Sequence, residues 1–174
     1  MLTLGIDTSN YTTSVAIYDG ENILKNCKKL LPVKDGERGL RQSDAVFYHT
    51  NQLADVFDEA LDSFNGKLDA IAVSSRPRDV EGSYMPCFTV GVNSARILAK
   101  ALKVPLYTVS HQAGHITAAL YSAKKLELMN EKFIAFHVSG GTTEALLVQK
   151  GTENPLDIEI IAKTLDLNAG QLVD

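Results

Sequence analysis

Two histidines, His111 and His115, have the residue type and spacing best suited to metal chemistry in this sequence. They lie in the segment SHQAGH, directly after an apolar stretch that ends at Val109. Ser110 is a favourable N-cap, so both histidines fall in the first turns of a predicted helix and on one face of it, where two imidazoles can share a metal ion. A third ligand is still required, and the same residues also fit an ordinary surface helix.

The other two histidines stand alone in the sequence. His49 falls within a predicted amphipathic helix, and His137 falls at the end of a predicted strand. A single imidazole offers no chelate geometry, so both are interpreted as structural or solvated residues.

The segment GIDTS follows a short apolar run near the N-terminus. In a turn after a buried strand, the carboxylate of Asp7 and the hydroxyls of Thr8 and Ser9 can hold a cation or orient water beside a phosphate. The same residue types are favoured in turns, because they hydrogen-bond to nearby backbone groups. Both interpretations stay open on the sequence alone.

A second polar turn, VSGGTTE, contains two glycines directly after a predicted strand. Gly140 and Gly141 would expose backbone N–H groups to a phosphate, and the hydroxyls of Ser139, Thr142 and Thr143 would add donors. No lysine follows the glycines as a nucleotide-binding P-loop requires, so a plain glycine-containing hairpin turn is an equal alternative.

The elements that must position these groups follow from the spacing of apolar residues. Residues 32–44 are polar and are predicted to form a loop. Around that loop the pattern predicts the order βββαβαβα over residues 1–125, with parallel pairing of the later strands. The predicted strands are 2–7, 12–20, 21–31, 68–75 and 104–110, and the predicted helices are 45–64, 88–103 and the one that follows Ser110.

The pattern then restarts after a polar passage at residues 122–132. Three further strands are predicted at 133–141, 142–151 and 157–164. Both openings read strand, small polar turn, strand, which is the plan of the two-lobed actin-like ATPase superfamily. We therefore expect an α/β protein with a first lobe at residues 1–125 and the start of a second, incomplete lobe at residues 133–174.

The composition indicates a folded globular protein, because 45% of the residues are apolar and 22% are charged. The formal net charge is −4 and no basic run is present, which argues against a stand-alone nucleic-acid binder and predicts that any tRNA contact needs partner subunits. Cys27 and Cys87 are far apart and have no CxxC spacing, which argues against a disulfide framework or a thiolate zinc site and favours a reducing compartment. No apolar run could cross a bilayer, so we expect a cytoplasmic protein without a membrane partner.

Three segments together resemble the TsaD family: LGIDTSNYTTSVAIYDG, VPLYTVSHQAGHITAAL and HVSGGTTEALLV, supported by LDLNAGQLVD near residue 174. The family is an actin-like enzyme that transfers a threonylcarbamoyl group from its adenylate to N6 of adenosine 37 in tRNA. The resemblance implies that His111 and His115 bind iron or zinc. It also implies that Val138 to Gly141 bind ATP or an acyl adenylate, and that Asp174 contacts the ribose.

The chain departs from the family pattern around the expected donor site. Thr142 stands where the family turn has a histidine, and Asn10 begins the stretch that usually has an acidic pair. The segment SRPRDVEGS replaces a glycine-proline-glycine loop, and the family's third metal ligand, an aspartate, lies beyond Asp174. The sequence assigns no catalytic residue.

Three functions follow, in decreasing order of support. The first is a divergent TsaD-like protein that binds nucleotide and metal, and the second is a non-catalytic scaffold similar to TsaB, suggested by the lost positions. A metallopeptidase comes last, because Gln112 stands where the HExxH motif has a glutamate general base. Expected partners are a TsaB-like protein or a second copy, bound through first-lobe helices or exposed second-lobe strands.

Overall fold

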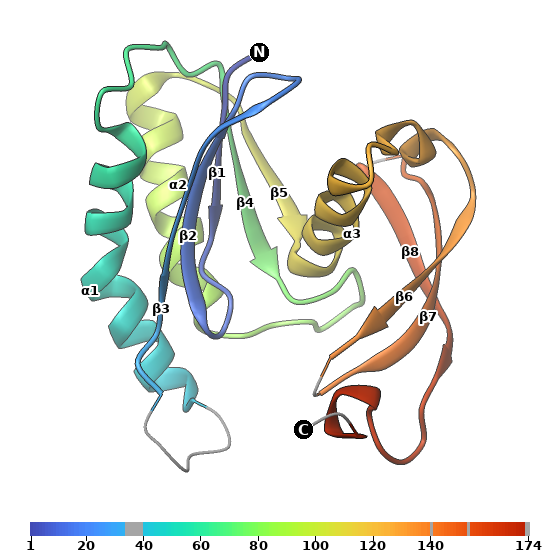
Figure 1. The fold of residues 1–174 in the computed structure, drawn as a ribbon. Helices are drawn as coiled ribbons and strands as arrows, with labels where there is room; N and C mark the ends of the chain where they lie inside the picture. Colours follow the sequence, from blue (N-terminus) through green and yellow to red (C-terminus); the bar gives the residue numbers. More distant parts are fainter. Residues whose placement is uncertain (34–39, 140, 153, 173–174) are drawn as a thin grey trace. The chain divides into compact units, whose positions relative to one another are not determined.

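The computed structural model of the chain describes residues 1–33, 40–139, 141–152 and 154–172. Its internal contacts divide it into two compact units, Met1–His111 and Gln112–Asp174. Each unit contains one β-sheet with helices packed on it, so the chain has the predicted α/β composition (Figure 1).

The first unit is built on a five-stranded mixed sheet with the order β3-β2-β1-β4-β5. The first three strands pair in antiparallel fashion, while β1, β4 and β5 are parallel. The predicted order βββαβαβ of this unit is therefore confirmed. The strands are β1 (Thr3–Asp7), β2 (Thr12–Tyr18), β3 (Ile23–Leu30), β4 (Ala70–Arg76) and β5 (Leu106–Ser110).

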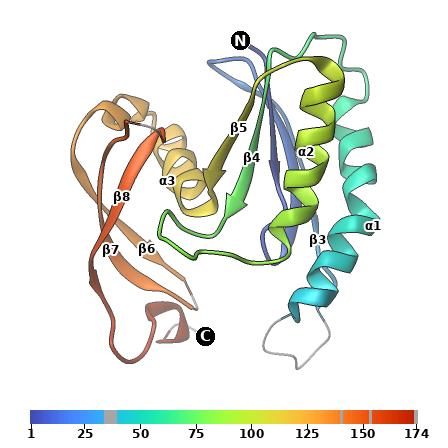
Figure 2. The ribbon, with the colours of Figure 1, turned by 180° about the vertical axis from the view of Figure 1, so that it is seen from behind.

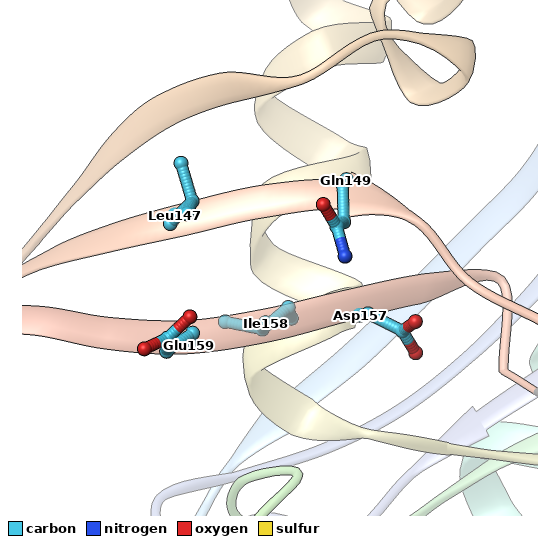
Figure 3. Close-up of a pocket in the computed structure, with 5 residues that line it drawn as sticks. All are labelled: Leu147, Gln149, Asp157, Ile158 and Glu159. Atoms are coloured by element: carbon cyan, nitrogen blue, oxygen red, sulfur yellow. The ribbon is translucent and has the colours of Figure 1, made fainter.

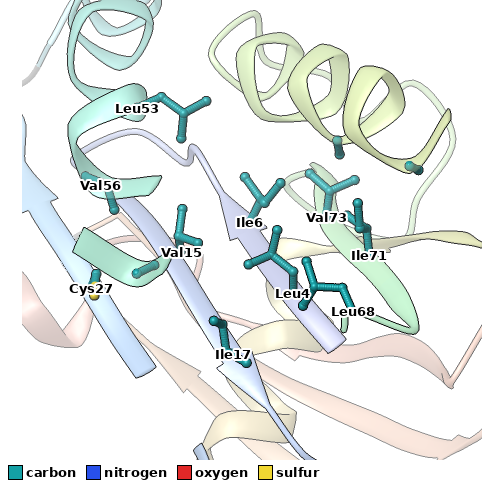
Figure 4. Close-up of a cluster of buried hydrophobic side chains, with 13 residues drawn as sticks. Leu4, Ile6, Val15, Ile17, Cys27, Leu53, Val56, Leu68, Ile71 and Val73 are labelled. Atoms are coloured by element: carbon teal, nitrogen blue, oxygen red, sulfur yellow. The ribbon is translucent and has the colours of Figure 1, made fainter. Parts of the chain in front are cut away.

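Two helices, α1 (Gln42–Leu61) and α2 (Phe88–Leu102), lie side by side on one face of this sheet, as Figure 2 shows. Alternate residues of β1 and β2 point to that face, which is why both strands have a strictly alternating burial pattern. The buried side chains of sheet and helices form one cluster, drawn in Figure 4. It contains Leu4, Ile6, Val15 and Ile17 from β1 and β2, Ile71 and Val73 from β4, and Leu53, Val56, Ala60, Ala95 and Ala99 from the helices.

Helix α1 begins and ends three residues earlier than its predicted limits of 45–64. Arg41 has an extended backbone conformation, so the helix can begin at Gln42, inside the stretch predicted as loop. At the other end Ser63 adopts a left-handed conformation with φ 59°, which terminates the helix before the apolar side chain of Phe64. The predicted limit at Phe64 was wrong because the spacing of apolar residues extends to Phe64, whereas the helical backbone ends at Leu61.

The second unit has a three-stranded antiparallel sheet in the order β6-β7-β8, as the sequence predicts. Its elements are α3 (His111–Ser122), the short 3₁₀ helix η1 (Leu126–Asn130), β6 (Phe133–Val138), β7 (Thr143–Lys150), β8 (Leu156–Lys163) and η2 (Ala169–Leu172). The first residue of α3, His111, belongs to the first unit. Ile116 and Leu120 of α3 pack on Leu146, Val148 and Leu156 of this sheet. The lobe limits at residues 125 and 133 stay a prediction, since α3 shares its core with the second sheet.

None of the helices in the described ranges is both long and apolar enough to span a bilayer.

Helix α2 approaches β1 closely at Gly91. The hydroxyl of Thr8 donates to the carbonyl of Cys87 at 2.9 Å and accepts from the N–H of Gly91 at 3.1 Å. A Cβ atom on Gly91 would lie 2.9 Å from Thr8 Oγ1 and 3.3 Å from Ile6 Cγ2. A glycine is therefore required where the first turn of α2 meets the end of β1.

Substitution of Gly91→Ala should destabilise the fold by about 1–3 kcal/mol, because the added methyl group overpacks the contact with Thr8 and Ile6. The matched control is Gly114→Ala in α3, where a Cβ atom would meet nothing within 4 Å. That change should stabilise by about 0.5–1 kcal/mol, because alanine favours a helix over glycine. Urea unfolding of both variants measures the difference, and equal effects would contradict it.

Candidate functional site

Asp7 and His111 meet at the carboxyl end of the parallel strands in the first unit. Asp7 is the last residue of β1, and His111 directly follows the last residue of β5. The Nδ1 atom of His111 lies 2.9 Å from Oδ2 of Asp7. This edge of an open α/β sheet is the usual place for ligands, because loops and helix starts converge there.

Asp7 is held as a carboxylate. Burial by itself would raise its pKa, but the hydrogen bond and positive charge of His111, with hydrogen bonds from Ser74 and Ser9, outweigh burial and lower the pKa to about 2. The Asp7 side chain is 22% exposed and that of His111 is 30% exposed. A fixed negative charge therefore lies beside a partly accessible imidazole.

The contact with Asp7 also bears on which nitrogen of the His111 ring is available to a metal ion. When Nδ1 carries the proton and donates to a carboxylate, Nε2 carries the lone pair that binds a metal ion. The ring of Phe88 packs edge-on against His111, with 6.1 Å between the ring centroids. Carboxylate and phenyl ring together limit the rotation of the imidazole.

The three residues predicted in the first turn have different positions. Asp7 faces the site, and its Oδ1 accepts the backbone N–H of Ser9 at 2.8 Å. Thr8 is fully buried and its hydroxyl joins β1 to α2, so that hydroxyl is not accessible to a ligand. Ser9 is half-buried and closes the turn.

A second polar cluster lies at the same edge and could not be predicted from the sequence pattern. Asp79 accepts hydrogen bonds from the guanidinium of Arg76 and the hydroxyl of Ser110, and its side chain is only 10% exposed. Arg76 and Asp79 belong to the segment SRPRDVEGS. Charged residues in a loop segment are usually exposed, so the sequence does not indicate that Asp79 is buried. This segment, which stands where the family has a glycine-proline-glycine loop, thus forms an ion pair that contacts Ser110, the residue before His111.

In the second unit, the polar turn closes a β-hairpin. Val138 pairs with Thr143 at the end of β6 and β7, and the N–H of Ser139 donates to the carbonyl of Thr142 at 2.7 Å. Gly141 is exposed, with open space where a Cβ atom would be. The predicted hairpin is confirmed, and the Ser139 N–H is already used within it.

Two predicted ligand-binding residues, Gly140 and Asp174, lie outside the described residues.

His115 is exposed on α3, one helical turn after His111. Its ring lies near that of His137 at the end of β6, with 6.1 Å between the centroids. Nδ1 of His137 lies 3.4 Å from the side-chain nitrogen of Gln112. Within the ranges that the structure describes, no group of three or more His, Cys, Asp or Glu side chains could hold a metal ion.

The remaining candidates for chemistry are buried in the first unit. His49 is fully buried, and its Nδ1 lies 2.7 Å from the hydroxyl of Thr13, which also accepts from Gln52. Burial lowers the pKa of His49, so it is a neutral core residue. Cys27 and Cys87 are free and buried, and burial raises the pKa of Cys87 to about 11. Neither thiol is suited to be a nucleophile or a ligand.

Figure 3 shows a shallow pocket between β7 and β8, lined by Leu147, Gln149, Asp157, Ile158 and Glu159. None of the predicted site residues lines it, so it adds nothing to the site described above.

The TsaD family model, described as tRNA N6-adenosine threonylcarbamoyltransferase, matches residues 34–174. The chain belongs to the TsaD family. The tRNA N6-adenosine threonylcarbamoyltransferase of Thermosipho africanus is 33% identical over 178 residues, which cover all of this chain and 50% of the relative. The protein of the same name from Borreliella burgdorferi strain ZS7 is 36% identical, again over the whole chain but 48% of the relative. This member thus spans about half the length of the curated relatives it matches.

Solved structures show the same fold at low sequence identity. YeaZ from Pseudomonas aeruginosa is similar with a TM-score of 0.55 and 18% identity, over 94% of this chain and 66% of that one. ROK hexokinase from Thermus thermophilus has a TM-score of 0.54 and 18% identity, over 88% of this chain and 50% of that one. The predicted actin-like ATPase fold of this TsaD-family chain is therefore confirmed.

The Asp7→Asn variant should be less stable than wild type at neutral pH, because the pKa of Asp7 falls from 3.8 to about 2 on folding. A lowered pKa contributes stability above about pH 4, here about 2 kcal/mol, and that contribution is lost as the pH falls toward 2. Urea unfolding between pH 3 and 7 should show a difference that narrows on acidification.

The control is Asp55→Asn, which removes a surface ion pair with Lys29. Such exposed pairs contribute at most about 1 kcal/mol. A penalty for Asp7→Asn that stays constant from pH 7 to pH 3 would show that the ionised carboxylate does not stabilise the fold.

Proposed function

We propose that this TsaD-family chain binds a metal ion and an adenine nucleotide, and takes part in the transfer of a threonylcarbamoyl group to N6 of adenosine 37 in tRNA. The observation that carries the proposal is the hydrogen bond between Asp7 and His111. It joins the predicted donor-site turn to the first of the two predicted metal ligands. The membership of the chain in the TsaD family also supports the proposal.

His111 and His115 would hold the metal, which we expect to be iron or zinc. Residues four apart on a continuous helix share one face, and imidazole suits both metals. The carboxylate of Asp7 is the kind of outer partner that metal-bound histidines have, because it fixes the tautomer and the ring orientation. When bound, the metal would act on the acyl donor as a Lewis acid and a template.

The nucleotide, ATP or an acyl adenylate, would be bound by the two polar turns. In the first turn, Asp7 and the backbone around Ser9 are the accessible groups, because Thr8 is buried. The hairpin at Val138 to Gly141 would offer its remaining backbone N–H groups, and Asp174 would contact the ribose. The net charge of −4 supports a requirement for partner subunits in tRNA binding.

A scaffold similar to TsaB is the alternative proposal. It is supported by Thr142 in place of the family histidine and by large apolar side chains on the first-unit helices. Phe47 of α1 is 61% exposed and Ile97 of α2 is 72% exposed, so both could contact a TsaB-like protein or a second copy. A peptidase has no support, because Gln112 is buried and its amide cannot act as a general base.

The test of the metal proposal is elemental analysis of the protein purified without a histidine tag. Wild type should contain close to one iron or zinc ion per chain, and treatment with a chelator should remove it. The His111→Ala and His115→Ala double variant should contain none, because both imidazole ligands are lost. Thr117→Ala, on the same helix, is the control and should keep the metal.

A wild-type protein that has no metal after growth in iron- and zinc-supplemented medium, and takes up neither on dialysis, would contradict the proposal. A stable one-to-one complex of that metal-free protein with a TsaB-like or TsaD-like partner would then support the scaffold. Threonylcarbamoyl transfer that persists in the double variant would contradict the role of the two histidines.

A further inference from the structure

A buried histidine of α1 contacts the start of β2, directly after the turn that follows Asp7. His49 is fully buried, and its Nδ1 lies 2.7 Å from the hydroxyl of Thr13. Gln52, in the next turn of α1, donates to the same hydroxyl at 2.8 Å and to the carbonyl of Lys29 at 3.2 Å. Because a carbonyl oxygen only accepts hydrogen bonds, the contact with Lys29 identifies the nitrogen of the Gln52 amide as the atom that faces Thr13.

These contacts determine which nitrogen of the His49 ring has the proton. The Thr13 hydroxyl accepts from Gln52, so its own hydrogen is available to donate, and Nδ1 of His49 is the acceptor at 2.7 Å. Burial lowers the pKa of His49, which keeps the ring neutral. A neutral imidazole that accepts at Nδ1 has its proton on Nε2, so Nε2 is a hydrogen-bond donor.

The Nε2 atom of His49 is buried, and none of the described residues meets it with ordinary hydrogen-bond geometry. The backbone of Ser9 nevertheless opposes the effect of burial and raises the pKa of His49. A backbone carbonyl has this effect because it stabilises the protonated ring, whereas an N–H group would do the opposite. Since Nδ1 is engaged by Thr13, the carbonyl of Ser9 is the acceptor available to Nε2.

Helix α1 contacts the same turn at a second point. Gln42, the first residue of the helix, donates from its side-chain nitrogen to Oδ1 of Asn10 at 3.2 Å. The turn closes where the N–H of Thr12 donates to the carbonyl of Ser9 at 3.3 Å. Ser9 also donates its own N–H to Oδ1 of Asp7 at 2.8 Å, so the position of this turn sets the orientation of the carboxylate.

We propose that His49 is a positioning residue for the turn that presents Asp7, and that it acts through a hydrogen bond from Nε2 to the carbonyl of Ser9. Being fully buried, it touches no ligand itself. It anchors the backbone from which Ser9 holds one oxygen of the Asp7 carboxylate, while the other oxygen contacts His111. The inference rests on the proposed function, because it concerns the proposed nucleotide-binding turn, but the contact itself can be measured without a ligand.

Two substitutions separate positioning from core packing. His49→Gln places an amide nitrogen near the position of Nε2, whereas His49→Asn places an oxygen near the position of Nδ1 and has no group at Nε2. Amide hydrogen exchange followed by NMR should be at least about fivefold faster at Ser9 and Thr12 in His49→Asn, and close to wild type in His49→Gln. The amide of Ile71, which donates to the carbonyl of Pro105, reports the stability of the core and should not change.

Binding of ATP, measured by calorimetry, should follow the same order. His49→Asn should weaken it about five- to tenfold, because the turn is no longer held, and His49→Gln should bind like wild type. Thr50→Ala, the neighbouring exposed residue of α1, is the control and should change neither exchange at the turn nor ATP affinity.

The wild-type protein gives a check that needs no substitution. With ¹⁵N-labelled histidine, NMR should show His49 with its proton on Nε2, and a proton on Nδ1 would overturn the proposal because the donor to Ser9 would be absent. Exchange at the turn that is faster in both variants, in neither, or equally faster at Ile71 would also overturn it. If the exchange results hold but wild type binds no ATP, the positioning role stands and the nucleotide part of the proposed function is wrong.

Discussion

The hydrogen bond between Asp7 and His111 joins residues that are 104 positions apart in the sequence. It forms because β1 and β5 are parallel members of one sheet, with only β4 between them, so their carboxyl ends meet at one edge. The bond places a permanent negative charge against an imidazole at the first residue of α3. The orientation of the His111 ring, and hence any metal chemistry at this helix, depends on that contact.

The packing behind the site keeps the end of β1 in place. Thr8 directs its side chain into the core, away from the edge, and its hydroxyl holds the first turn of α2 through Cys87 and Gly91. Asp7 therefore points to the site because Ile6 before it in β1 and Thr8 after the strand both point into the core. Side chains alternate between the two faces of the strand, and this alternation both buries the apolar residues of β1 and directs the Asp7 carboxylate to the site. The stability of the first unit and the geometry of its site therefore have a common origin.

The substitutions that separate this chain from the usual family pattern have structural roles of their own. Arg76 and Asp79 belong to the segment that stands where the family has a glycine-proline-glycine loop. They form an ion pair, and Asp79 also accepts a hydrogen bond from the hydroxyl of Ser110. Gln112, at the position where a zinc peptidase has its general base, is buried against His137. At these positions the side chains of this chain are therefore engaged in contacts within the described structure.

The sequence by itself determined the α/β class, the order of strands and helices, the family, and the pairing of His111 with His115 on one helix. These features depend on local periodicity and short motifs, which are readable without distant contacts. Only the tertiary structure decided that Thr8 is an anchor, that His49 is a core residue, and that His137 lies beside His115. Those outcomes depend on contacts between residues that are far apart in the sequence. The order and register of the strands determine which of these residues come into contact.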